Sequence, residues 1–101
     1  MNPGNMQKMM AQAKKMQEQL QQQIAEIRVE ASTGGGMVTV KMDGQKHVLA
    51  IEIEQDAMED REMLQDMVRG AVNEAAKRVD DEAQGKMGGM LGGMGLPPGM
   101  F

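Results

Sequence analysis

Cysteine and tryptophan are absent from this sequence of 101 residues, and histidine, serine and aromatic residues occur once each. Without cysteine the chain cannot form a disulfide framework, a thiolate zinc site or a thiol nucleophile. One histidine and one serine leave little for nucleophilic or metal catalysis. We therefore predict that the protein is not an enzyme and holds no metal and no cofactor.

Long apolar runs are absent as well. No segment approaches the roughly 20 consecutive apolar residues that a membrane-spanning helix needs. Residues 1–5 lack the basic start and apolar continuation of a secretory signal. We expect a cytoplasmic protein without a membrane partner.

The charge is acidic in total but unevenly distributed. The chain has 11 basic and 15 acidic side chains and a formal net charge of −4, whereas a nucleic-acid binder usually shows a basic surface. Residues 1–28 nevertheless carry four basic and two acidic side chains, while residues 56–85 carry four basic and nine acidic ones. Exposed charges separated by more than about 8 Å are largely screened at physiological salt. A basic segment can therefore act locally despite the negative total.

Residues 6–28 predict one long amphipathic helix. Its apolar residues recur at intervals of three or four, which places them in one narrow stripe. The members of the stripe are Met6, Met9, Ala13, Met16, Leu20, Ile24 and Ile27. The outer face is mostly glutamine, interspersed with Lys8, Lys14 and Lys15.

Residues 28–54 change to the alternation that is typical of strands. The run of three glycines at residues 34–36 predicts a turn, and Asp43-Gly44 predicts a two-residue type I′ hairpin between the second and third strands. This hairpin pairs Val40 with His47.

The predicted register defines two faces of the hairpin, because side chains alternate along a strand. One face is expected to point to the core and carries Val38, Val40, Met42, Leu49, Ile51 and Ile53. The other face is partly apolar. We predict that a second chain covers it and that Met37, Val48 and Ala50 form the dimer interface.

A second helix is predicted over about residues 60–84, with Asp56 or Asp60 as its N-cap. Residues 85–101 contain seven glycines and two prolines, a composition that resists ordering. We therefore divide the chain into one domain, residues 1–84, and a flexible Gly/Met/Pro tail, residues 85–101.

Helix length predicts projecting arms and a dimer. A helix of about 22 residues is about 33 Å long, whereas a strand of six to eight residues spans about 20–27 Å. Both helices must overhang the sheet, yet the apolar stripe of the first helix continues to Met6. Packing between the helices or a second chain can cover it, and a symmetric homodimer is the commonest solution.

This order of elements resembles the YbaB/EbfC family of bacterial nucleoid-associated DNA-binding proteins. The matching segments are residues 6–10, 12–17, 34–40, 43–44, 62–68, 71–75 and 95–99. The resemblance implies an α+β fold in the order α-β-β-β-α and a tweezer-like homodimer with projecting helical arms. It also implies a protein that binds duplex DNA with loose sequence preference and alters its conformation. The implied roles are nucleoid organisation, DNA protection and regulation of gene expression.

One departure from the family pattern is visible. The family often places an Asp-Pro step after the third strand, whereas this chain has Glu54-Gln55-Asp56. The departure leaves the start of the second helix open and does not affect the fold.

Two groups of basic residues are candidates for phosphate contact. The first helix supplies Lys8, Lys14 and Lys15, and the end of the second helix supplies Lys77, Arg78 and Lys86. If the two helices run antiparallel, the groups converge at the tips of the arms. The simpler interpretation is that these side chains are only solvated.

A second hypothesis belongs to a different functional class. Methionine-rich apolar surfaces adapt to varied partners, and the chain contains 14 methionines. The alternative is a helical-arm adaptor or chaperone-like protein that binds other proteins. Met87, Met90 and Met94 could offer three thioethers to a soft metal, but no cysteine or nearby histidine strengthens such a site.

Overall fold

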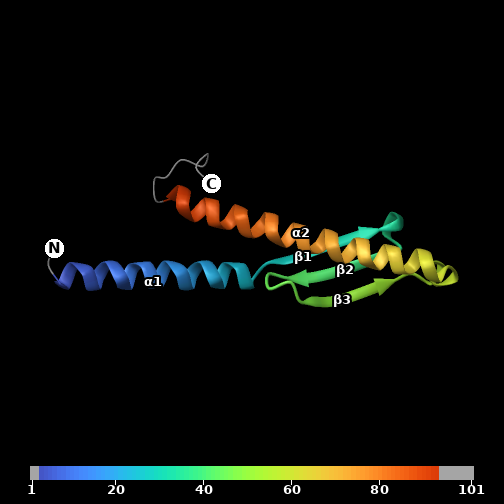
Figure 1. Cartoon of the computed structure of the whole chain (residues 1–101), viewed down its shortest axis with the longest axis horizontal. Helices are drawn as coiled ribbons and strands as arrows, with labels where there is room; N and C mark the ends of the chain where they lie inside the picture. Colours follow the sequence, from blue (N-terminus) through green and yellow to red (C-terminus); the bar gives the residue numbers. More distant parts are fainter. Residues whose placement is uncertain (1–2, 94–101) are drawn as a thin grey trace.

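A computed structural model describes residues 3–93 and shows an elongated α+β molecule of 69 × 26 × 15 Å (Figure 1). The elements in chain order are α1 (Pro3–Ala25), β1 (Arg28–Thr33), β2 (Val38–Asp43), β3 (Val48–Ile53) and α2 (Arg61–Gly93). Two 3-10 turns, η1 (Gly34–Gly36) and η2 (Gln55–Glu59), join β1 to β2 and β3 to α2. The predicted fold class and order of elements are confirmed.

The sheet is antiparallel with strand order β1-β2-β3, and α2 lies across one of its faces (Figure 1). Helix α2 packs on β1 and β2. The buried core is formed by one face of these two strands and by one stripe of α2: Ile27, Val29, Ala31, Val38, Val40, Met42, Ala71, Ala75 and Val79. No aromatic side chain takes part, because the chain has only Phe101.

Small residues allow α2 to lie close to the sheet. Ala71 and Ala75 are fully buried, and a Cβ added at Gly70 would lie 3.3 Å from the Thr33 Cγ2 atom. The Thr33 hydroxyl donates a hydrogen bond of 2.7 Å to the carbonyl oxygen of Met67. This bond satisfies the Thr33 hydroxyl at the edge of the core and links the end of β1 to α2.

The predicted hairpin between β2 and β3 is wrong in length and register. Val40 pairs with Ile51 and not with His47, and a bulge separates Lys41 from Met42. The turn has three residues between Asp43 and His47, with hydrogen bonds from the Lys46 N–H to the Asp43 carbonyl and from the Asp43 N–H to the His47 carbonyl. The Asp43 carboxylate also accepts the N–H groups of Gln45 and His47 at 2.9 Å each, which stabilises the longer turn.

The core prediction is half correct. Both registers keep Val38 and Val40 on one face with Ile51 and Ile53, and the β2 members are buried. The β3 members are not, since Leu49, Ile51 and Ile53 are between 41% and 52% exposed. The physical reason is that α2 packs on β1 and β2 and leaves β3 uncovered.

The structure selects one of the two predicted N-caps of α2, whereas the ends of both helices differ from the prediction. Asp60 is the N-cap of α2, because its carboxylate accepts the Met63 N–H at 3.0 Å, and residues 55–59 form η2 in place of a capping box. Helix α1 ends at Ala25, three residues early, and α2 continues through Gly93, past the predicted end at residue 84. Each residue added to a helix contributes one backbone hydrogen bond. A glycine lowers helix stability by only about 1 kcal/mol relative to alanine, so the glycines after residue 84 do not end α2. Residues 94–101 of the predicted tail lie outside the described residues.

Two methionines at opposite extremes of burial test this packing. We expect Met42→Ala to lower the free energy of unfolding by about 2–5 kcal/mol, because the side chain is 2% exposed and its removal leaves a cavity. The matched control Met10→Ala, at a side chain 70% exposed, should change it by less than about 0.5 kcal/mol. Urea denaturation at one fixed protein concentration measures both. Equal effects would contradict the described core.

Candidate nucleic-acid interface

Helix α1 projects from the sheet as a free arm (Figure 1). None of its 23 residues is buried, and Met16, Leu20 and Ile24 are half-buried. The amphipathic stripe predicted for this helix therefore reaches the protein interior only at its C-terminal end, where Ile24 packs against the core. We call residues Pro3–Ala25 the α1 arm.

A guanidinium group caps the C-terminal end of the α1 arm. Arg28 Nη1 donates hydrogen bonds of 2.9 Å to the carbonyl oxygen of Ala25 and 2.7 Å to that of Ile27. The last carbonyls of a helix lack partners within the helix and carry partial negative charge, so a cation there stabilises the helix end. Arg28 is thus a structural residue at the joint between α1 and β1.

The α1 arm presents three unpaired cations. Lys8, Lys14 and Lys15 are exposed, and within the described part of the chain none of them forms a salt bridge or side-chain hydrogen bond. The first acidic residue of the sequence is Glu18. The charged side chains in the outer half of the arm are therefore all basic, beside glutamines and the exposed Met6, Met9 and Met10. Lysine and glutamine side chains suit phosphate and base-edge contacts.

The basic residues predicted on α2 differ in their availability. Lys77 is exposed and Lys86 is half-buried, and neither forms an ion pair among residues 3–93. Arg78 is engaged: its Nη1 donates to the Glu30 carbonyl oxygen at 2.7 Å, and its Nε lies 3.5 Å from Glu74 Oε1. The bond to Glu30 joins α2 to β1, and the contact with Glu74 lies within α2, so Arg78 has a structural role.

The two helices run antiparallel (Figure 1), but Arg78 bonds to β1 and the nearby Asp80 pairs with Lys46 of the β2–β3 turn, so Lys77 and Arg78 lie beside the sheet. The predicted convergence of the basic groups at the tips of the arms is therefore wrong for these two residues. The α1 arm extends farther along the long axis than α2 does, and the helices separate away from the sheet. Acidic residues accompany the α2 group: Asp80, Asp81 and Glu82 follow Arg78 directly. Of the two basic groups, the one on the α1 arm therefore has fewer acidic neighbours.

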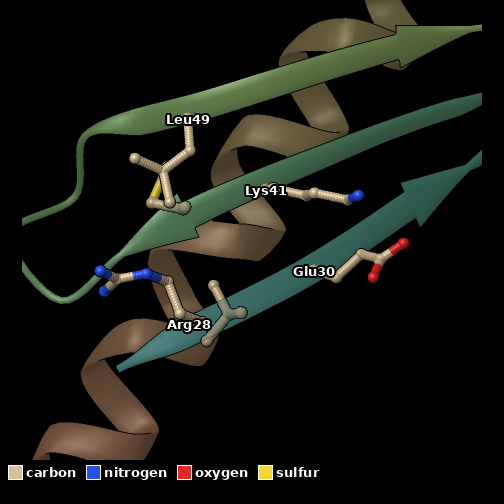
Figure 2. A pocket seen from close by; sticks show the side chains of 6 residues that line it. Arg28, Glu30, Lys41 and Leu49 are labelled. Carbon is tan, nitrogen blue, oxygen red and sulfur yellow. The ribbon is translucent and has the colours of Figure 1, made fainter. Parts of the chain in front are cut away.

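An open hollow of about 290 Å³ occupies the sheet near the base of the α1 arm (Figure 2). It is lined by Arg28, Val29, Glu30, Lys41, Met42 and Leu49. Figure 2 shows Glu30 on β1 beside Lys41 on β2, and these two residues are register partners. Lys41 Nζ forms its salt bridge with Glu52 Oε1 on β3, at 3.2 Å, and a cross-strand pair of opposite charges stabilises the sheet locally.

Titratable and metal-binding features are sparse. Among residues 3–93 no group of three or more His, Asp or Glu side chains could hold a metal ion. Hydrogen bonds from the backbone N–H of His47, then of Gln45, hold the pKa of Asp43 below its ordinary value against some desolvation. In the part of the chain described here, no helix has the length and apolarity to cross a membrane.

Comparison with known proteins agrees with this architecture. Residues 1–94 match the model of the YbaB/EbfC DNA-binding family. A nucleoid-associated protein of Acidobacterium capsulatum is 47% identical over the full length of both chains, and one of Koribacter versatilis is 52% identical over 92% of this chain and 94% of its own. The crystal structure of an uncharacterized protein from Helicobacter pylori has a TM-score of 0.76 with 25% identity, covering 90% of this chain and 98% of that one.

The fold and the basic arm define a small α+β protein that carries projecting helices on a three-stranded sheet. The family match extends over this whole architecture, from α1 to the end of α2. The chain belongs to the YbaB/EbfC DNA-binding family.

Neighbouring cations on α2 test the distinction between structural and free side chains. We expect Arg78→Ala to lower the free energy of unfolding by about 1 kcal/mol, since it removes a charge-assisted hydrogen bond to β1. Lys77→Ala should change stability by less than about 0.5 kcal/mol, because its side chain is exposed and forms no ion pair within residues 3–93. Thermal and urea unfolding compare the two, and a reversed order would refute the assignment.

Proposed function

We propose that this protein binds duplex DNA in the bacterial nucleoid as a homodimer, with loose sequence preference, and alters the conformation of the DNA. The observation that carries the proposal is the α1 arm with three exposed, unpaired lysines in a chain of this DNA-binding family. Relatives that are named nucleoid-associated proteins support the location. Roles in nucleoid organisation, DNA protection and gene expression belong to the same proposal.

Phosphate contact explains how an acidic protein can bind DNA. Each lysine that neutralises a phosphate releases condensed counterions, which favours binding independently of sequence. The net charge of −4 acts against a broad coating of DNA, while the α1 arm is basic over its outer half. We infer modest, salt-sensitive affinity in which Lys8, Lys14 and Lys15 contribute most, and Lys77 and Lys86 contribute as secondary contacts.

The first test measures the salt dependence of binding to random duplex DNA. Two arms with three lysines each predict a slope of log K against log salt of about −5, and Lys14→Gln with Lys15→Gln should reduce it to about −2. The matched control neutralises Arg61 and Arg69 at the start of α2, near the opposite end of the molecule from the tip of the α1 arm (Figure 1). This control should leave the slope nearly unchanged. A slope near zero in the unaltered protein would instead favour the adaptor hypothesis.

The dimer proposal rests on the uncovered strand β3. This strand is an edge of the sheet, and Val48, Leu49, Ile51 and Ile53 on it are all more than 40% exposed. A long apolar edge strand is a template for pairing with another chain. The predicted interface residues Val48 and Ala50 lie on it, and the Met37 carbonyl oxygen accepts the Glu54 N–H at 2.8 Å just beyond its end. Two β3 strands paired about a twofold axis would form one continuous sheet.

The second test measures mass in solution. We expect the unaltered protein to behave as two chains of 11.0 kDa in light scattering after size exclusion. Ile51→Glu with Ile53→Glu should give single chains, because two carboxylates would be placed in the apolar interface. Met58→Glu, at another exposed apolar residue outside β3, is the matched control and should stay dimeric. Single chains in the unaltered protein would overturn the dimer.

A further inference from the structure

The turn between β2 and β3 lies between the bases of the two helices. On one side Gly44 touches the last turn of α1: a Cβ added to Gly44 would collide with the backbone carbonyl of Ile24. On the other side Lys46 Nζ lies 2.8 Å from Asp80 Oδ1 of α2. The same short turn therefore contacts both helices at the point where they leave the sheet.

Glycine at residue 44 is required by space and not by backbone conformation. The non-glycine residue of this turn with positive φ is Lys46, at 65°, whereas the glycines with positive φ are Gly34, Gly35 and Gly36. The obstacle to a side chain at Gly44 is backbone, which cannot rotate away as the end of a flexible side chain can. A larger residue at this position must therefore move the turn, α1 or both.

The turn itself is stiff enough to transmit that displacement. The Asp43 carboxylate accepts backbone N–H groups from Gln45 and His47 at 2.9 Å each, and the Asp43 backbone N–H donates to the His47 carbonyl oxygen at 3.1 Å. The α1 arm is less restrained, because none of its residues is buried. Of the two partners at the contact, the arm is the one that can yield.

We propose that Gly44 is a positioning residue that sets the direction of the α1 arm relative to α2. Close contact with the Ile24 carbonyl aligns the arm, and Arg28 keeps its last turn intact. The direction of the arm determines where Lys8, Lys14 and Lys15 lie with respect to the basic residues of α2. The consequence for DNA rests on the proposed function, whereas the geometric statement does not.

Spin-label distances in the absence of DNA test the geometric statement. The chain has no cysteine, so Gln12→Cys and Gln84→Cys, both at exposed positions, can be labelled without background. Labelled chains diluted with excess unlabelled chains report distances within one protomer. Residue 12 lies about 18 Å along α1 from Ile24, so a tilt at the base should shift the mean distance by roughly 5 Å in Gly44→Ala.

Two further variants keep this experiment decisive. Gly89→Ala adds a Cβ in open space on α2 and should leave the distance distribution unchanged. Arg28→Lys keeps the charge but loses the geometry of the guanidinium group, and it should broaden the distribution even if Gly44→Ala fails to fold. The proposal is overturned if Gly44→Ala folds with the distances of the unaltered protein. It is equally overturned if Gly44→Ala fails to fold and Arg28→Lys gives the unaltered distribution.

DNA affinity then separates this inference from the proposed function. At fixed salt we expect Gly44→Ala to raise the Kd for duplex DNA at least about tenfold, or about 1.4 kcal/mol. A displaced arm with unchanged affinity would overturn the role of Gly44 in DNA binding. An unaltered protein that does not bind DNA would overturn the proposed function and leave the distance result standing.

Discussion

One helix can cover only two strands, and the rest of this structure depends on that limit. A helix with its side chains is about 10–12 Å wide, and neighbouring strands lie about 4.8 Å apart. Helix α2 packs on β1 and β2, where Ala71 and Ala75 allow close approach, and β3 keeps an exposed apolar surface. The other helix, α1, does not supply the missing cover, because it projects away from the end of the sheet (Figure 1). The single chain is thus a half-covered sheet with a projecting arm.

The charged side chains of α2 and of the α1 arm also differ in whether they have partners. Two acidic residues of α2 support its attachment, since Asp80 pairs with Lys46 and Glu74 lies beside Arg78, which bonds to β1. The lysines of the α1 arm have no such partners in the described chain, because nothing packs around them. The net charge of −4 therefore comes from the rest of the molecule and not from the α1 arm.

Most of the architecture could be predicted from local sequence patterns, and the errors share a cause. Helical stripes, alternating strands and the exposure of Lys8, Lys14 and Lys15 follow from spacing along the chain. The register of β3 did not, because the side chain of Asp43 stabilises a three-residue turn that competes with the expected two-residue one. Ile51 and Ile53 still share a face with Val38 and Val40 despite this error, whereas the bulge pairs Val48 with Met42, from which the predicted register had separated it. The structural role of Arg78 had no signal in the sequence, because its acceptor on β1 is 48 residues away.

The sequence by itself determined the α+β class, the order of the elements, the family and the basic character of the first helix, because these depend on neighbours within a few residues. Only the tertiary structure decided which apolar strand stays uncovered and which lysines and arginines are engaged. It also changed the meaning of Gly44, which is required by the carbonyl of Ile24 and not by the φ angle that its turn motif predicted. Such features arise from contacts between segments distant along the chain, and no periodicity or spacing within one segment encodes them.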